Sequence, residues 1–108
     1  MRFAFDDEQR ALKDSARRFL DRHASSDQLR AATQTAQGWD TALWRRMAGE
    51  LGWPAMTIPE VYGGLDLGYV ELVAVMEEMG RANAASPLFA TVALGVNALL
   101  VAGTEHQK

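Results

Sequence analysis

The segment Leu51–Arg81 (LGWPAMTIPEVYGGLDLGYVELVAVMEEMGR) limits how this chain can fold. Pro54 and Pro59 each lack a backbone N–H and have a fixed φ, so neither can lie in the interior of a helix. Gly63 and Gly64 follow shortly afterwards, and glycine can adopt positive φ without a steric penalty. A helix that reaches this segment must therefore end before the first proline, and another can begin only after the glycines.

We accordingly expect one helix to end near Gly52 and the next to run from about Gly68 to Arg81. The residues between them are too apolar for a solvated loop, since they include Trp53, Met56, Ile58, Val61, Tyr62, Leu65 and Leu67. The sequence predicts an irregular connector, from Trp53 to Leu67, that packs against helices on both sides.

The first helix is predicted to run from an N-cap at Asp6 to His23. Gln9 stands at the N3 position of a capping box, and the apolar residues at helical spacing are Leu12, Ala16, Phe19 and Leu20. The basic residues beside this stripe have two interpretations, a polyanion site or a solvated face; they are Arg10, Lys13, Arg17 and Arg22. Acidic residues are interspersed among them, which favours the solvated face.

A second, weakly packed helix is expected within the polar stretch Ser25–Gln37, capped by Ser26 or Asp27 and ending by Gly38. Leu29 is the one large apolar residue of this stretch. The expected helix therefore has little surface with which to pack.

A third helix is predicted to begin after a cap at Asp40 and to end with Gly52 at the C′ position. Its apolar stripe consists of Leu43, Trp44, Met47, Ala48 and Leu51. Trp44 and Trp53 flank its end, where two rings could form a ligand cage. Packing in a core or an interface is the commoner use of such rings and is the preferred interpretation.

The fourth helix, from about Tyr69 to Arg81, is apolar on more than one side, which is typical of a helix buried on several faces. Glu77 and Glu78 could suggest acid–base chemistry, but adjacent helical positions point about 100° apart and cannot converge on one substrate atom. The preferred interpretation is that Glu77 and Glu78 form structural ion pairs. Glu78 and Arg81 have the i,i+3 spacing of a pair of small value, and a lysine or arginine elsewhere is the alternative partner.

Ser86 and Pro87 are typical of the N-cap and first position of a fifth helix, which is expected to end at Gly103. No charged residue occurs from Ala82 to Thr104, a length that would suit a membrane span. The cap, the polar residues within the stretch and its many Ala and Gly residues instead favour a buried central helix. Together the segments predict an all-α array of about five main helices in one domain over residues 1–108.

Composition excludes several classes of function. The 108 residues carry a net charge of −3 with both signs interspersed, so there is no basic surface for nucleic acid. There is no cysteine, which excludes disulfides and thiolate metal sites. No apolar signal segment follows Met1, so a cytoplasmic protein is the expectation.

Motifs for catalysis are also lacking. The sequence has no G-x-G-x-x-G, no P-loop and no arrangement of Ser-His-Asp or Cys-His type. His23 and His106 fall at predicted helix ends far apart in the sequence. We therefore predict no catalytic, cofactor-binding or metal-ligating residue in this chain.

One combination of motifs is nevertheless specific. The pattern Ile58-Pro59-Glu60-x-Tyr62-Gly63-Gly64, followed by Glu77-Glu78-Met79-Gly80-Arg81, resembles the N-terminal helical domain of the acyl-CoA dehydrogenases. The resemblance extends to the family's opening helix through Phe5, Asp6-Asp7 and Gln9, and to the end of its fifth helix through Gly103-Thr104-Glu105-x-Gln107-Lys108. It covers essentially the whole chain.

The resemblance implies that this domain is followed by a β-domain and a C-terminal four-helix domain, neither of which is in residues 1–108. The family oxidises the Cα–Cβ bond of an acyl thioester: a glutamate of the C-terminal domain takes the α-proton and the β-hydride goes to N5 of FAD. We therefore expect a fragment of a longer FAD-dependent oxidoreductase of fatty acid or lipid metabolism, inactive alone and unable to hold FAD firmly. The implied partners are an acyl-CoA, an electron-transfer acceptor and other subunits of a homo- or hetero-oligomer.

In the family, this domain provides one wall and the floor of the acyl cavity. The fifth helix passes under the distal end of the acyl chain, and the corresponding positions here are Leu88, Phe89, Ala90 and Ala93. They are assigned by position along the helix rather than by a motif, and plain core packing is the alternative for each. We expect these residues to bind substrate in the complete enzyme.

Two functions from different classes remain open. The substrate-cavity domain of an acyl-CoA dehydrogenase is preferred; the alternative is a free-standing helical interaction module or a non-catalytic subunit derived from that family. The fourth and fifth helices carry more apolar surface than this chain can cover, so the isolated chain is expected to be marginally stable and to self-associate.

Overall fold

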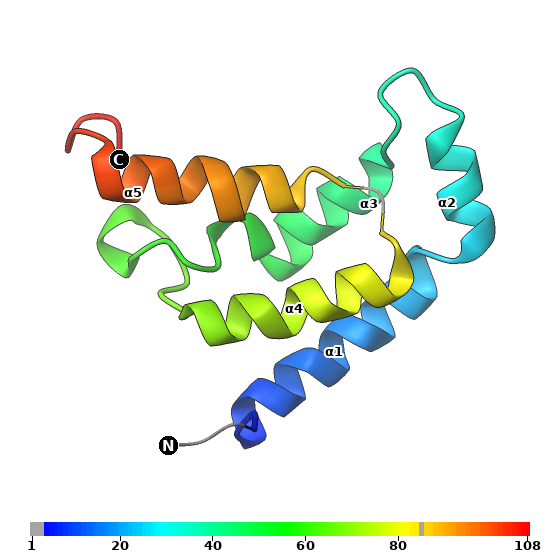
Figure 1. Ribbon diagram of the computed structural model, residues 1–108, viewed down its shortest axis with the longest axis horizontal. Coiled ribbons are helices and arrows are strands. Elements are labelled where there is room, and N and C mark those ends of the chain that lie inside the picture. The colour runs from blue at the N-terminus through cyan, green and yellow to red at the C-terminus, as the bar shows by residue number, and fades with distance from the viewer. Residues whose placement is uncertain (1–3, 85) are drawn as a thin grey trace. The chain divides into compact units, whose positions relative to one another are not determined.

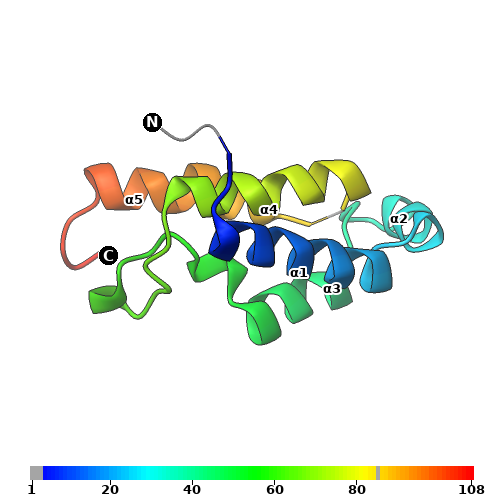
Figure 2. The ribbon, with the colours of Figure 1, turned by 90° about the horizontal axis from the view of Figure 1, so that it is seen from below.

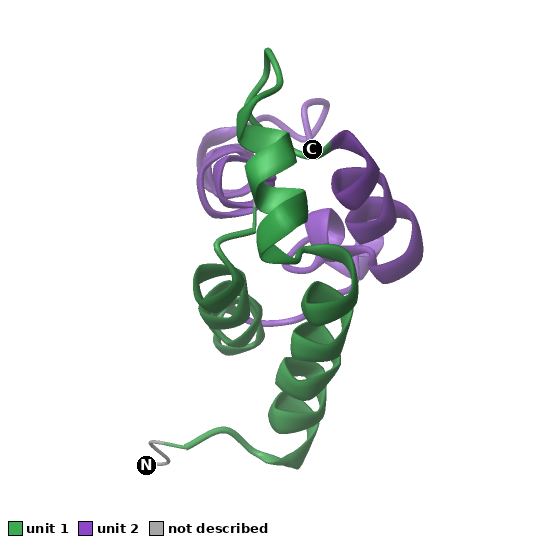
Figure 3. Ribbon diagram, turned by 90° about the vertical axis from the view of Figure 1, so that its right-hand side faces the viewer, with its two compact units in different colours: residues 1–40, 69–85 green, residues 41–68, 86–108 purple. Residues whose placement is uncertain are grey.

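The computed structural model describes residues 4–84 and 86–108, and these residues form helices and turns without a β-strand. The predicted all-α fold is confirmed. The chain divides into two compact units, of which unit 1 comprises residues 1–40 and 69–85 and unit 2 comprises residues 41–68 and 86–108 (Figure 3). The described residues include five α-helices, α1 to α5, and short 3₁₀ or π-helical segments, η1 to η4.

Unit 1 is built on helices α1 (Asp7–His23) and α4 (Tyr69–Ala82), which pack along each other (Figures 1 and 2). Helix α2 (Ser26–Thr33) follows α1. The buried apolar side chains of α1 and α4 are Ala16, Leu20, Leu72, Ala74, Val75 and Met79. The spacing of three and four residues within each helix gives each an apolar stripe of the kind that the sequence predicts.

The helix starts are set by capping boxes. The Asp6 carboxylate accepts a hydrogen bond from the Gln9 backbone N–H at 2.8 Å, and the Gln9 side chain accepts one from the Asp6 N–H at 3.0 Å. This confirms the predicted cap of α1. The predicted cap of α2 is wrong, because Ser25 takes this role in place of Ser26 or Asp27. Gln28 stands three residues after Ser25 and completes a reciprocal box that neither alternative would have.

Unit 2 begins with α3 (Thr41–Arg46), which continues into the π-helical turn η1 (Met47–Leu51). Gly52 ends this helix in the left-handed region, with φ of 66°, as predicted for the C′ position. The bounds of α4 in unit 1 also agree with those expected on the other side of the connector. The proline and glycine positions therefore predicted both helix ends.

The connector contains two 3₁₀ turns, η2 (Trp53–Ala55) and η3 (Glu60–Tyr62), and folds back on itself. Three of its N–H groups donate to carbonyls about ten residues earlier, at 2.9–3.0 Å: Leu65 to Ala55, Asp66 to Ile58 and Leu67 to Met56. At Gly64 the two stretches approach so closely that an added Cβ would run into the Ile58 backbone. The connector is thus a hydrogen-bonded, rigid element.

Burial in the connector is uneven. Trp53 and Met56 are buried, as predicted, but Val61 is 83% exposed and Leu65 is 48% exposed. The predicted packing of the connector therefore holds for Trp53 and Met56 but does not extend to Val61 and Leu65. Val61 lies in the 3₁₀ turn η3, in which none of the three residues is buried.

The fifth predicted helix begins after Ser86, whose hydroxyl accepts a hydrogen bond from the Leu88 N–H at 3.3 Å. It consists of a π-helical segment, η4 (Phe89–Val96), and an α-helical segment, α5 (Asn97–Ala102), and ends before Gly103. No helix in the described residues is long and apolar enough to cross a membrane. The sequence predicted a buried central helix here. In this chain that prediction is wrong, because large apolar side chains of η4 and α5 are exposed.

Candidate functional site

The four predicted substrate-binding residues lie at the start of η4, in unit 2. Phe89 is 60% exposed, Ala90 is exposed and Ala93 is partly exposed. Leu88 has no exposed surface and belongs to the core of the chain. The structure thus places three of the four where a ligand or another part of the protein can reach them, and the fourth behind them.

An exposed apolar surface extends from these residues along the rest of the helix. We call it the η4–α5 face; its large exposed members are Phe89, Leu94, Leu99 and Val101, of which Leu99 and Val101 point to different sides of α5. The residues that turn the other way, Leu88 and Val92, are completely buried. The start of this helix is therefore anchored by Leu88 and Val92, whereas α5 has no buried residue.

The end of η4 has an additional side-chain contact. The Asn97 amide donates to the Ala93 carbonyl at 2.9 Å, while the Asn97 backbone N–H donates to the Leu94 carbonyl. Asn97 therefore donates hydrogen bonds to two carbonyls at the point where the helix changes from π to α geometry. Sequence reasoning missed this role because Asn97 stood out only as a polar residue in an apolar stretch.

A second cluster lies in unit 1, around Glu78 of α4. Its side chain is 2% exposed, and it is the one buried charged residue among those described. It accepts charged hydrogen bonds from Lys13 Nζ at 2.8 Å, Arg17 Nε at 3.0 Å and Arg81 Nε at 2.7 Å. We call these four residues the Glu78 cluster.

Neighbouring carboxylates balance its three cations. Lys13 Nζ also contacts Glu77 at 2.8 Å, and an Arg81 terminal nitrogen contacts Asp21 at 2.8 Å. Burial raises the pKa of Glu78, but the hydrogen bonds from Lys13, Arg81 and Arg17 outweigh it and lower that pKa to about 2. The same contacts with Glu77 and Glu78 raise the pKa of Lys13. The cluster is a fully ionised link between α1 and α4 rather than an acid–base pair.

The Glu78–Arg81 pair predicted from the sequence is therefore present, and the structural interpretation of Glu78 is confirmed. The solvated-face interpretation agrees with Arg17, which is 54% exposed, but it did not include the bonds of Lys13 and Arg17 to the buried Glu78 carboxylate. Their spacing of four residues places them on one ridge of α1. This spacing could have indicated that Lys13 and Arg17 act together, but nothing in the sequence predicted that α4 would be their neighbour.

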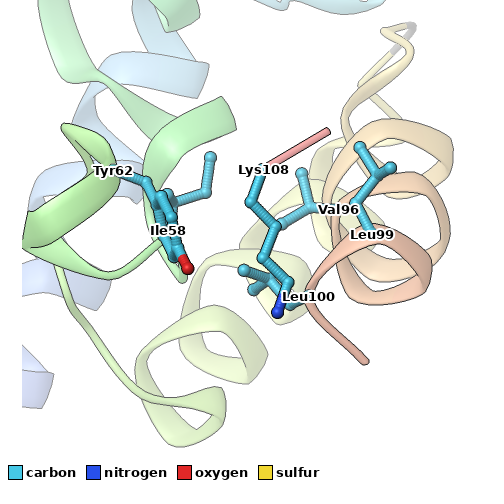
Figure 4. A pocket seen from close by; sticks show the side chains of 6 residues that line it. All are labelled: Ile58, Tyr62, Val96, Leu99, Leu100 and Lys108. Carbon is cyan, nitrogen blue, oxygen red and sulfur yellow. The ribbon is translucent and has the colours of Figure 1, made fainter. Parts of the chain in front are cut away.

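A small pocket occurs in unit 2, with a volume of about 50 Å³. It is lined by Ile58, Tyr62, Val96, Leu99, Leu100 and Lys108 (Figure 4). Small-molecule sites usually measure roughly 300–1,000 Å³, so a flavin does not fit here. At its polar edge the Tyr62 hydroxyl donates to Glu105 Oε2 at 2.6 Å, which raises the pKa of Tyr62 and lowers that of Glu105.

The described residues show no catalytic constellation. Among them, no group of three or more His, Asp or Glu side chains is placed to hold a metal ion. What they do offer is an anchored apolar helix face and two well-fixed helical units. Such an arrangement can shape a binding site but supplies no nucleophile or proton acceptor at it.

Comparison with known proteins identifies the family. A family model described as the acyl-CoA dehydrogenase N-terminal domain matches residues 6–108. The chain belongs to this family. The match includes the connector, the Glu78 cluster and the η4–α5 face, so each of these features lies within the acyl-CoA dehydrogenase N-terminal domain.

Individual relatives agree with this assignment. The acyl-CoA dehydrogenase IpdE2 of Mycolicibacterium smegmatis is 32% identical over 99 residues, which are 92% of this chain and 32% of that protein. The mitochondrial isovaleryl-CoA dehydrogenase of Arabidopsis thaliana is 36% identical over 96% of this chain and 26% of its own length. This chain thus spans about a third or less of the length of these acyl-CoA dehydrogenases.

Solved structures share the fold. The Tcur3481-Tcur3483 steroid ACAD, solved as a variant, superposes with a TM-score of 0.84 at 35% identity, over 94% of this chain and 27% of that one. The ChsE4-ChsE5 complex of Mycobacterium tuberculosis gives a TM-score of 0.82 at 28% identity, over 94% of this chain and 28% of the other. The acyl-CoA dehydrogenase N-terminal fold is therefore shown by both sequence and structure.

Proposed function

We propose that this chain is the cavity-forming N-terminal domain of a flavin-dependent acyl-CoA dehydrogenase that introduces a double bond between Cα and Cβ of an acyl-CoA. The observation that carries the proposal is the η4–α5 face: an apolar helix surface that is open on one side and anchored by Leu88 and Val92 on the other. Exposed apolar surface of this kind marks a place for a ligand or another protein surface.

Within this face, Phe89, Ala90 and Ala93 are proposed to line the floor of the acyl cavity. Phe89 offers a large apolar ring, whereas the two alanines leave room above the helix. Leu88 supports them from the core, since its own side chain has no exposed surface. The volume left above the alanines would then limit the length or bulk of the acyl group.

The chemical steps are proposed to belong to the rest of the protein. The described residues of the face include no proton acceptor, and the pocket of unit 2 is too small for FAD, so the flavin is proposed to be held by other domains. When bound, FAD accepts the hydride. An electron-transfer acceptor and a second subunit are further proposed partners; a relative of this fold was solved as the ChsE4-ChsE5 complex, which supports assembly with another chain.

The substitution Ala90→Leu in the full-length enzyme tests the proposal. Interiors are close-packed, and overfilling one costs about 1–3 kcal/mol; each methylene accommodated or excluded is worth roughly 1 kcal/mol. We expect kcat/KM to fall progressively with acyl length, while short acyl-CoAs remain substrates and the flavin spectrum is unchanged. Because one structural relative is named as a steroid ACAD, a polycyclic acyl-CoA belongs in the series.

Ala31→Leu is the matched control, because Ala31 is an exposed alanine of α2 and lies outside the η4–α5 face. It should leave the acyl preference unchanged. If Ala90→Leu instead lowered kcat/KM equally for every acyl group, Ala90 would be a packing residue and the cavity assignment would fail. Unchanged kcat/KM for all of them would support the interaction-module alternative.

A further inference from the structure

We infer that Asn97 is a positioning residue that sets the acyl preference of the proposed cavity by holding η4 in its wide helical form. The inference rests on the proposed function, because the face that it concerns carries Phe89, Ala90 and Ala93. Asn97 itself is not proposed to contact substrate. It acts through the Ala93 carbonyl, to which its amide donates at 2.9 Å.

The first step concerns backbone hydrogen bonds. A π-helix pairs each carbonyl with the N–H five residues later, whereas an α-helix uses the fourth. Where the two meet, the pairing changes by a residue, and carbonyls near the junction need other donors. Asn97 stands at this junction, and its side chain and backbone N–H bind two successive carbonyls, those of Ala93 and Leu94.

The second step concerns which side chains face inward. Leu88 and Val92 are fully buried, and Val96 lines the small pocket of unit 2 together with Leu99 and Leu100 (Figure 4), so the inward residues up to Val96 are spaced by four. In an α-helix a step of four residues turns about 40° beyond a full turn. An α-helix would therefore carry this row around the axis by roughly 80° over two such steps. The wider η4 turns less per residue and so does not carry the row around the axis in this way.

The third step links the inward row to the opposite face. If η4 reverted to an α-helix while Leu88 and Val92 stayed buried, residues after Val92 would rotate relative to Phe89 and Ala90. Ala93 and Leu94 would then present a different surface to a ligand. Among residues 94–102, Asn97 has the one polar side chain, so no other side chain of this stretch competes for the Ala93 carbonyl. Asn97 therefore determines the shape of the face.

The experiment uses the full-length enzyme with Asn97→Asp, which keeps the size of the side chain but replaces its donor with an acceptor. Two quantities are measured: amide hydrogen exchange in residues 89–101, and the ratio of kcat/KM for a long and a short acyl-CoA. Loss of the bond should speed exchange in this segment by about tenfold and change the ratio by several-fold. Asn97→Ala is the second variant if Asn97→Asp fails to fold, and exposed Ala98 provides the control Ala98→Ser.

The outcomes separate this inference from the proposed function. Faster exchange together with a changed ratio in Asn97→Asp, and neither in Ala98→Ser, supports the inference. Unchanged exchange overturns it, as does faster exchange with an unchanged ratio in an enzyme whose ratio does respond to Ala90→Leu. If neither Ala90→Leu nor Asn97→Asp changes the ratio, both the cavity assignment and the specificity role of Asn97 are overturned. Faster exchange in Asn97→Asp would in that case show that Asn97 has a purely structural role.

Discussion

Removing the negative charge of Glu78 should destabilise the packing of α1 against α4. The substitution Glu78→Gln keeps the shape of the side chain but leaves Lys13, Arg17 and Arg81 facing a neutral amide. In the native chain these groups lower the pKa of Glu78 from an ordinary 4.5 to about 2. The hydrogen bonds at 2.7–3.0 Å are the cause.

The magnitude follows from this pKa. At 1.36 kcal/mol per pKa unit, the change corresponds to about 3 kcal/mol of stability at neutral pH. The three basic side chains are 26%, 54% and 38% exposed, so water screens the interaction and lets them turn outward in the variant. We therefore expect Glu78→Gln to lower the free energy of unfolding by about 1–2 kcal/mol.

The stability lost in Glu78→Gln should become smaller as the pH falls. A folded-state pKa below that of the unfolded chain stabilises the fold above the unfolded pKa, near 4.5, and this stabilisation disappears as the pH falls through about 2. The difference between the native chain and Glu78→Gln should thus be complete at pH 7 and shrink in strong acid. Urea denaturation followed by far-ultraviolet circular dichroism at several pH values measures it.

Glu77→Gln is the matched control, since Glu77 is the adjacent residue, contacts the same Lys13 and is half exposed. An exposed pair of this kind is worth less than about 1 kcal/mol. Equal losses in the two variants, or a difference that does not change between pH 7 and strong acid, would refute the reasoning that burial and three converging cations give Glu78 its effect.

Three other expectations concern the backbone and the surface. Gly64→Ala should cost about 1–3 kcal/mol in urea denaturation because its Cβ meets the Ile58 backbone, whereas Gly80→Ala, with nothing within 4 Å, should be neutral or stabilise α4 by up to about 1 kcal/mol. Ser25→Ala should lower stability by about 1 kcal/mol through loss of the α2 cap, whereas Ser26→Ala should change it by less than about 0.5 kcal/mol. The 108-residue chain alone should self-associate and bind dyes that report exposed apolar surface, owing to the η4–α5 face; a monomer without dye binding would contradict this.

Much of the fold could be predicted because its signals are local. Pro54, Gly52 and the glycines after Pro59 act on their own backbone, and the Asp6–Gln9 box involves residues three apart. The connector was recognised as packed from its composition. The outward position of Val61 was not, because hydrophobicity does not say which way a 3₁₀ turn presents its side chains.

The features that the sequence did not predict either join residues far apart in the sequence or lie in segments with few polar residues. Lys13 and Glu78 are 65 positions apart, so their pairing depends on which helices become neighbours. The π form of η4 has no signal in a run of apolar and small residues, since almost any face would look the same. The four positions proposed to line the cavity, Leu88, Phe89, Ala90 and Ala93, were assigned by family resemblance, and burial then separated Leu88 from the other three.

The division into units has a consequence for how the chain is connected. Each unit is made of two stretches, and the chain crosses between units after residues 40, 68 and 85. The connector closes through backbone bonds over roughly ten positions, whereas the bonds from Arg17 to Glu78 and from Arg81 to Asp21 close loops of 61 and 60 positions. Longer loops cost more entropy to close, so we expect the connector to form first during folding. A single cut between residues 41 and 68 would leave both units composed of two separate peptides.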